Sequence, residues 1–176
     1  ISEKTVDKLK AQLARHPSDA VVFSDFRHGI FNKFIIPQLA AAVPAGAMRV
    51  ADSQVSNRWG NILEFQNFDL CTPTEREARF ALGDQDTTIR PLALDLYKRA
   101  GCKVLMLKLG ERGMVTYRAP NPDVRSFFTV DSFADKVLDP VGAGDALLSY
   151  ATLTMAATGS NVLASILGAL AANKDH

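Results

Sequence analysis

Apolar residues follow two alternating periodicities from the start of the chain, and these periodicities predict its secondary structure. Residues 3–16 carry apolar side chains at the three-to-four-residue spacing of an amphipathic helix. The segment AVVFSD at 20–25 is a short β-branched run that ends in polar residues, which is typical of a strand. A helical pattern returns over 30–42. We therefore expect a helix, a strand and a second helix in this order.

The same alternation continues to the end of the chain. Strands are expected at 48–52, 68–72 and 103–109, and helices at 73–82 and 86–100. The closely spaced segments GMVTYRA and RSFFTV predict an antiparallel pair of strands. Strands that are separated by helices of about 10 to 15 residues indicate βαβ units. The pattern predicts an α/β fold, with a mostly parallel sheet covered by helices on both faces as a three-layer α/β/α sandwich.

The last part of the chain requires a test for a membrane span. No charged residue occurs from Ala146 to Asn173, and this stretch is long enough to cross a bilayer. However, TGSN at 158–161 contains residues that end one helix and begin another. We therefore predict two buried helices and no association with a membrane.

Composition narrows the classes of function. The chain of 176 residues has 20 basic and 19 acidic side chains, and this near-neutral balance argues against a nucleic-acid-binding surface. Cys71 and Cys102 are the only cysteines, and both lie in or beside apolar segments. Two buried thiols are typical of a reducing compartment, so we expect a cytoplasmic protein. The chain begins without methionine and stops within a helical pattern, which indicates a piece of a longer polypeptide.

The stretch DPVGAGDALL at 139–148 carries the clearest chemical signal. Gly142, Ala143 and Gly144 open a helix, where small residues let a ligand approach backbone N–H groups that have no partner inside the helix. Together with the helix dipole, these groups form a site for an anion such as phosphate. Asp145 would repel that anion, unless it accepts the proton of a nucleophile that attacks the phosphorus.

A simpler interpretation of the same stretch is structural. Asp145 in a first helical turn would stabilise the helix dipole, and glycine is common near helix starts. Two other phosphate-binding motifs are excluded. GxxxxGK[ST] does not occur, and GxGxxG fails because Leu147 stands at its third glycine.

Several further motifs occur together with GAGD in one order. DPVGAGDALL resembles the signature of the PfkB, or ribokinase-like, carbohydrate kinases, with Pro140 at a position where threonine is common. LKLGERG at 107–113 resembles the nucleotide loop of that family, and LCTPTEREA at 70–78 is similar to its Thr-Pro-Asn-x-x-Glu segment. VVFSDFRHGIF at 21–31 and RVADSQ at 49–54 resemble segments in the kinase half of bifunctional ADP-heptose synthases.

The resemblance implies a fold and an activity. Residues 1–176 would form the C-terminal part of a single ribokinase-like kinase domain, which is incomplete here. The activity would be ATP- and Mg²⁺-dependent phosphoryl transfer to a sugar or sugar phosphate, such as heptose 7-phosphate. A nucleotidyltransferase domain fused to the kinase is a further implication. A homodimer remains open.

The resemblance also implies roles for individual residues. Asp145 would be the catalytic base, and the amides of Gly142, Ala143 and Gly144 would hold the transferring phosphoryl group. The implied ATP-site residues are Lys108, Gly110 and Gly113. Asp25 and Asp52 would bind the substrate, and Glu77 would help to place Mg²⁺. A lysine in an apolar strand needs a charged partner, and phosphate would supply one for Lys108.

Some positions depart from the family pattern, and they leave alternatives open. Thr74 stands where the family usually has Asn, and Glu77 has the alternative role of a solvated acid near Arg76 and Arg79. Asp25 has the alternative role of a turn cap. Gln54 and Val55 replace the Pro-Lys of the heptose kinases, and Arg58 is a candidate substitute for that lysine. The alternative functions are a non-catalytic nucleotide- or sugar-phosphate-binding module and a kinase of another small alcohol.

Overall fold

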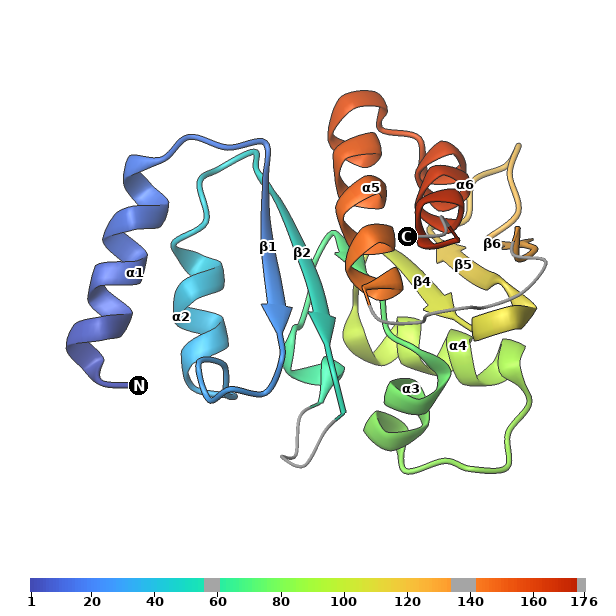
Figure 1. Ribbon diagram of the computed structural model, residues 1–176, viewed down its shortest axis with the longest axis horizontal. Helices are drawn as coiled ribbons and strands as arrows, with labels where there is room; N and C mark the ends of the chain where they lie inside the picture. Colours follow the sequence, from blue (N-terminus) through green and yellow to red (C-terminus); the bar gives the residue numbers. More distant parts are fainter. Residues whose placement is uncertain (56–60, 134–141, 174–176) are drawn as a thin grey trace.

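The computed structural model describes residues 1–55, 61–133 and 142–173, which form a central sheet with helices on both sides (Figure 1). The sheet contains β1 (Ala20–Asp25), β2 (Met48–Ser53), β3 (Leu70–Cys71), β4 (Val104–Lys108), β5 (Met114–Arg118) and β6 (Phe127–Val130), in this spatial order. The first four strands are parallel, and β5 and β6 continue the sheet as an antiparallel pair. The predicted α/β class with a mostly parallel sheet is therefore confirmed.

The helices are α1 (Glu3–Arg15), α2 (Ile35–Ala41), α3 (Glu75–Leu82), α4 (Ile89–Ala100), α5 (Ala143–Thr158) and α6 (Asn161–Ala172). Two short 3₁₀ turns, η1 (Ile62–Glu64) and η2 (Gly110–Arg112), were not expected from the sequence. Some predicted bounds change because polar side chains cap the backbone. Asn32 accepts N–H bonds from Phe34 and Ile35, so α2 begins later than predicted. The carboxylate of Asp84 similarly accepts N–H bonds from Asp86 and Thr87 ahead of α4.

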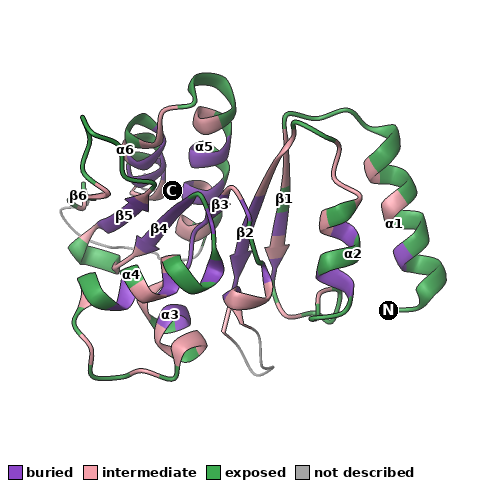
Figure 2. Cartoon of the chain, turned by 180° about the vertical axis from the view of Figure 1, so that it is seen from behind, coloured by how far each residue is buried: buried purple, intermediate pink, exposed green. Residues whose placement is uncertain are grey.

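Alternating side chains of the strands fill two separate cores. In β4, Leu105 and Leu107 pack with the side chains of α1 to α4, whereas Val104 and Met106 pack with those of α5 and α6. All four side chains are buried (Figure 2). The nearly continuous apolar run of β4 is thereby explained, because this strand is covered on both faces in a three-layer arrangement.

The uncharged C-terminal stretch folds as two packed helices, as predicted. Gly159 ends α5 in the left-handed conformation, with φ of 66°, and the Ser160 side chain caps α6 by accepting the N–H of Leu163 at 3.2 Å. No helix among the described residues is long and apolar enough to cross a membrane. Cys71 and Cys102 are buried free thiols, as expected. Their mutual hydrogen bond and burial raise the pKa of Cys71 well above its usual range.

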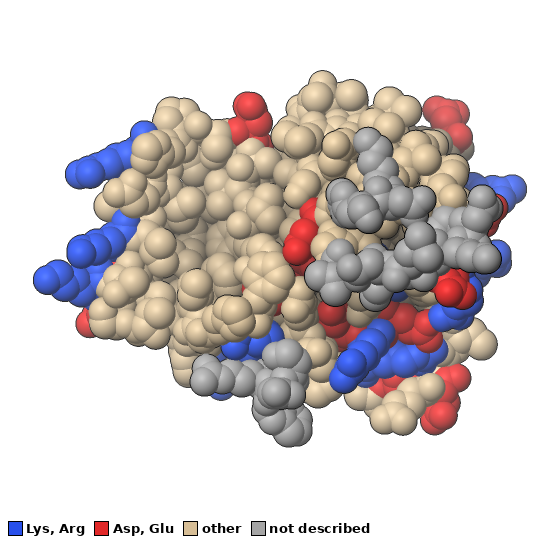
Figure 3. Space-filling view, viewed as in Figure 1, with Lys and Arg blue, Asp and Glu red and all other residues tan. Residues whose placement is uncertain are grey.

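The carboxyl ends of the parallel strands meet at one edge of the sheet. Asp25, Ser53 and Lys108 are the last residues of β1, β2 and β4, and Thr72 directly follows β3. In open parallel sheets, ligands bind beyond this edge. In the face seen in Figure 3, a broad uncharged area occupies the left half, with basic side chains at its left edge, and acidic and basic side chains gather at the lower right.

Candidate active site

The amino end of α5 is open for a ligand. Gly142 precedes the helix in the left-handed conformation, with φ of 84°, and it provides no side-chain cap. The N–H groups of Ala143, Gly144 and Asp145 belong to the first turn and have no acceptor inside the helix. A Cβ placed on Gly142 would meet no atom of the described structure within 4 Å. Within the described residues this turn is therefore not filled by side chains, as an anion site requires.

Asp139 and Pro140 lie outside the described residues, and so does Arg58, the candidate substitute for the family lysine. Asp145 itself is exposed at the start of α5.

Lys108 and Asp52 form a largely buried ion pair beside this turn. The ammonium nitrogen of Lys108 lies 3.2 and 3.3 Å from the two carboxylate oxygens of Asp52. The same nitrogen would lie 3.5 Å from a Cβ on Gly144, so Lys108 extends from the end of β4 to the first turn of α5. Lys108 has the charged partner that its apolar strand predicts, and in this structure the partner is the Asp52 carboxylate. A phosphoryl group bound at α5 would also lie close to the ammonium.

The pKa of Asp52 is affected by its burial and by charged neighbours that include Asp145, the predicted catalytic base. Burial raises the pKa of Asp52, and the nearby Lys108 ammonium partly opposes this shift. The negative charge of Asp145 raises the pKa of Asp52 further. The ion pair and the approach of Lys108 to Gly144 bring Asp52 and Lys108, from β2 and β4, next to the first turn of α5, which also contains Asp145. We call these four residues the cluster.

The Thr72 hydroxyl is a further polar group beside Asp52, directly after β3. Thr72 is fully buried, and its N–H donates to the carbonyl of Ala51 at 3.1 Å. Its hydroxyl interacts weakly with the Asp52 carboxylate but makes no hydrogen bond of normal geometry within the described residues. A buried hydroxyl without a full partner is suited to contact a polar ligand or water.

Glu77 has a clear structural role at the start of α3. Its carboxylate accepts the N–H of Thr74 at 2.6 Å, and the Thr74 hydroxyl accepts the N–H of Glu77 at 3.3 Å, which together form a capping box. Glu77 is only 8% exposed, and burial raises its pKa. It is thus neither a solvated acid nor the partner of Arg79, which pairs with Glu75 at 2.8 Å.

The described residues of this region could contribute only a few carboxylates to a Mg²⁺ site. No group of three or more His, Cys, Asp or Glu side chains suited to a metal occurs among the described residues. Mg²⁺ in phosphoryl-transfer sites is usually held by one or two carboxylates together with substrate phosphates and water. Burial raises the pKa of Glu77, and the charges of Lys108 and Asp52 also affect it, so Glu77 and Asp52 are two carboxylates of this region that Mg²⁺ could use.

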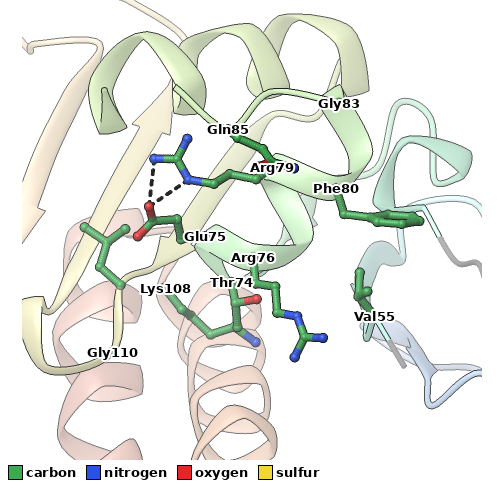
Figure 4. A pocket seen from close by; sticks show the side chains of 11 residues that line it. Val55, Thr74, Glu75, Arg76, Arg79, Phe80, Gly83, Gln85, Lys108 and Gly110 are labelled. Carbon is green, nitrogen blue, oxygen red and sulfur yellow. Dashed lines mark hydrogen bonds and ion pairs between the residues drawn. The ribbon is translucent and has the colours of Figure 1, made fainter. Parts of the chain in front are cut away.

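A cavity of about 1030 Å³ adjoins the cluster (Figure 4). It is lined by residues of α3, the end of β4, and the segments after β2 and β4, including Val55, Thr74, Arg76, Arg79, Lys108 and Gly110. Two of the three predicted nucleotide-site residues, Lys108 and Gly110, therefore face one cavity. Gly113 has a different environment, because a Cβ there would lie 2.1 Å from the carbonyl oxygen of Val130.

The carboxylate of Asp25 is already engaged by the turn that follows β1. It accepts the N–H of Arg27 at 2.8 Å and the hydroxyl of Ser53 at 3.0 Å, and it forms an ion pair with the Arg27 guanidinium. Asp25 is 3% exposed. This geometry corresponds to the alternative role of a turn cap, and its predicted contact with substrate stays a prediction.

The sequence interpretation missed two features of this region. Glu75 joins Arg79 of α3 to Arg112 of η2 through two ion pairs, and Arg76 lines the cavity. The sequence contained a signal for Arg76. A cation in the first turn of a helix faces the positive end of the helix dipole, so Arg76 stands where local energetics disfavour it.

The fold and the cluster define a class: a ribokinase-like α/β/α domain with an open helix terminus at the carboxyl edge of its parallel strands. The chain belongs to the pfkB family of carbohydrate kinases, whose family model matches residues 2–172. It spans about a third of the length of the curated relatives that it matches and about half of the solved chains.

Individual relatives are distant in sequence. The chain is 28% identical over 178 residues to the bifunctional protein HldE of Desulfatibacillum aliphaticivorans, covering 98% of this chain and 35% of that protein. Phosphofructokinase-2 from Escherichia coli in complex with potassium is similar with a TM-score of 0.81 at 21% identity, covering 98% of this chain and 56% of that chain. Arabidopsis thaliana ribokinase complexed with ribose and ATP has a TM-score of 0.70 at 20% identity, with 98% and 52% covered. These structures support the fold.

Proposed function

We propose that residues 1–176 form the C-terminal part of a kinase domain that transfers a phosphoryl group from ATP to a hydroxyl of a sugar or sugar phosphate. The observation that carries this proposal is the open first turn of α5, with Lys108 beside Gly144 and Asp145 in the same turn. The family match to carbohydrate kinases supports the reaction class. Heptose 7-phosphate is the proposed acceptor, because the segments at 21–31 and 49–54 resemble the kinase half of ADP-heptose synthases.

Each residue of the cluster has a proposed role in the transfer. Bound ATP supplies the transferable γ-phosphoryl group, and Mg²⁺ offsets its negative charge. Asp145 accepts the proton of the acceptor hydroxyl, whose oxygen then forms a bond to the γ-phosphorus while the bond to the β–γ bridging oxygen breaks. The amides of Gly142, Ala143 and Gly144 and the ammonium of Lys108 stabilise the charge on the phosphoryl oxygens.

The geometry also suggests how the remaining predicted residues contribute. Asp52 orients Lys108 toward the first turn of α5, and Glu77 and Asp52 would contact Mg²⁺ or its water ligands. Gly110 would border the nucleotide. These assignments are proposals that follow from the cavity and the ion pair.

The proposal extends to the context of the whole protein. The buried free thiols of Cys71 and Cys102 fit a cytoplasmic location. The printed names of the relatives describe bifunctional proteins, which fits a nucleotidyltransferase domain elsewhere in the polypeptide. A homodimer is the proposed assembly.

The test is ADP production by the full-length protein across a panel of sugars and sugar phosphates. Asp145→Asn should lower turnover by about 10³-fold while the affinity for ATP changes little, because only the proton acceptor is removed. Asp7→Asn, which alters an exposed acid on α1, is the control and should have no effect. Turnover at the wild-type rate in Asp145→Asn would end the proposed role.

A second candidate function is a non-catalytic module that binds a nucleotide or sugar phosphate. Thr74 favours it, because this residue stands at the usual family Asn and its N–H and hydroxyl are used in the capping box. Nucleotide binding without turnover of any member of the panel would support this candidate. Turnover of a non-sugar alcohol alone would instead support a kinase with a different acceptor.

A further inference from the structure

Among the described residues, three cationic side chains line the cavity, and two of them have partners. Arg79 donates to the Glu75 carboxylate at 2.9 Å and to the carbonyl of Thr87 at 3.1 Å. Lys108 contacts Asp52 at 3.2 Å. These two cations are thereby held in place, and their charges are offset within the protein.

Arg76 differs from both. No hydrogen bond or ion pair engages its guanidinium within the described part of the chain, and the residue is exposed. Figure 4 shows its side chain extending into the cavity between Lys108 and Val55. Arg76 is therefore a cation of the cavity lining whose charge and five N–H donors are available to a ligand.

The local backbone makes this position more electropositive. Arg76 is the second residue of α3, where the unpaired amides and the helix dipole already carry partial positive charge. The Glu77 carboxylate and the Thr74 hydroxyl satisfy two of these amides, but they do not contact Arg76. An anion in this part of the cavity would relieve the repulsion between Arg76 and the helix terminus.

Lys108 and Arg76 lie at different places along the cavity (Figure 4), so each could contact a different anionic group. Lys108, beside Gly144, marks the proposed position of the transferring phosphoryl group. In Figure 4, Gly110 lies on one side of Lys108 and Arg76 on the other, toward Val55 after β2. The proposed position of the nucleotide against Gly110 leaves the Arg76 side of the cavity for the acceptor.

We propose that Arg76 is a specificity-determining residue that binds a phosphate group carried by the acceptor, remote from the hydroxyl that is phosphorylated. This proposal rests on the proposed function and adds to it the residue that recognises the phosphate group of a phosphorylated acceptor. The planar guanidinium can donate two parallel hydrogen bonds to phosphate oxygens, and this fixes the acceptor's orientation. A free sugar would lack this contact and would be a poorer substrate.

The test uses the full-length protein and matched acceptors: heptose 7-phosphate, fructose 6-phosphate and ribose 5-phosphate, each with its unphosphorylated parent. Arg76→Gln should lower kcat/KM for the preferred sugar phosphate by about 10- to 100-fold, mainly through KM. The KM for ATP and kcat/KM for the parent sugar should change less than about 3-fold. Arg76→Lys should retain part of the activity, because lysine keeps the positive charge but cannot donate two parallel hydrogen bonds to one phosphate group.

Arg15→Gln, an exposed arginine on α1, is the control and should leave all constants unchanged. An unchanged kcat/KM in Arg76→Gln, an equal loss for the sugar phosphate and its parent, or preference of the wild type for the parent would overturn the proposal. A rise confined to the KM for ATP would also overturn it, since it would assign Arg76 to the nucleotide.

A second measurement separates this proposal from the proposed function. If the wild type turns over no acceptor, the proposed function fails, and the role of Arg76 is then tested by calorimetric titration with the same sugar phosphates. About 10-fold weaker binding by Arg76→Gln than by the wild type would support the phosphate contact. Equal affinity, or no binding by the wild type, would overturn it.

Discussion

Lys108 and Asp52 are 56 residues apart in the sequence, yet the ammonium of one lies 3.2 Å from a carboxylate oxygen of the other. Their side chains are 13% and 7% exposed, so both charges are largely removed from water. The two residues come from the carboxyl ends of the parallel strands β2 and β4, and the ammonium of Lys108 lies close to the first turn of α5. The ion pair neutralises a lysine that would otherwise face a helix terminus of the same sign.

The first prediction concerns the stability of this pair. Lys108→Met should lower the free energy of unfolding by about 3 kcal/mol, because it leaves the Asp52 carboxylate buried without a counter-charge. Combining it with Asp52→Asn should cost less than the sum of the two single changes, by about 1 to 3 kcal/mol. Urea denaturation of the four proteins measures this coupling. Additive losses would show that the ion pair contributes nothing to folding.

The second prediction separates stability from function at Gly144. A Cβ there would make only an ordinary contact, 3.5 Å from the Lys108 ammonium, so Gly144→Ala should leave stability unchanged or raise it by up to about 1 kcal/mol. The methyl group would nevertheless obstruct the amides of the first turn, and turnover should fall about 10²-fold.

Gly168→Ala provides the opposite control. Its Cβ would lie 3.2 Å from the carbonyl oxygen of Leu147, where α5 and α6 pack closely. This change should lower the melting temperature and leave the KM for ATP unaltered. Normal turnover in Gly144→Ala would argue against a phosphoryl site at this helix terminus.

The sequence predicted the fold well where one local signal dominates. The β-branched run at 20–25 is bounded by polar residues, and β1 has the same bounds. The covered strand β4 was recognised from its continuous apolar run. β3 is shorter than the predicted 68–72, because only Leu70 and Cys71 pair with both neighbouring strands.

The site was predicted less completely, because its contacts are long-range. An apolar strand that contains Lys108 indicates a charged partner, but no local pattern identifies Asp52 as that partner. Asp25 ends its strand as expected, while the positive φ of Arg27, at 62°, brings a guanidinium back onto the carboxylate. The Thr74–Glu77 capping box was accessible from its spacing, since Thr-x-x-Glu before a helix is such a signal.

The third prediction is a pH dependence that originates from Glu77. Because burial raises its pKa in the folded protein, Glu77 binds its proton more tightly when folded than when unfolded. Its contribution to stability is therefore fully present below the unfolded value, near 4.5, and is lost as the pH rises through the folded pKa. Glu77→Gln removes this titration but keeps an oxygen to accept the Thr74 N–H.

Urea denaturation between about pH 4 and pH 8 tests this sign. The stability of the wild type relative to Glu77→Gln should fall as the pH increases, and Thr74→Ala should cost about 1 kcal/mol through loss of the cap. A difference that is constant with pH would show that Glu77 is not perturbed. If Glu77 also contacts Mg²⁺, Glu77→Gln should raise the Mg²⁺ concentration required for half-maximal turnover, whereas Thr74→Ala should raise it less.

The fourth prediction compares two glycines of the proposed nucleotide loop. Gly113 has φ of 79°, and a Cβ on it would lie 2.1 Å from the Val130 carbonyl oxygen, so the backbone after β6 would have to move. Gly113→Ala should therefore lower the free energy of unfolding by more than about 3 kcal/mol. Gly110 has φ of 62° but meets nothing within 4 Å, and Gly110→Ala should cost only about 1 to 2 kcal/mol of backbone strain. Thermal unfolding of both variants measures the difference. Equal losses would mean that φ alone, and not the approach of β6, requires glycine at Gly113.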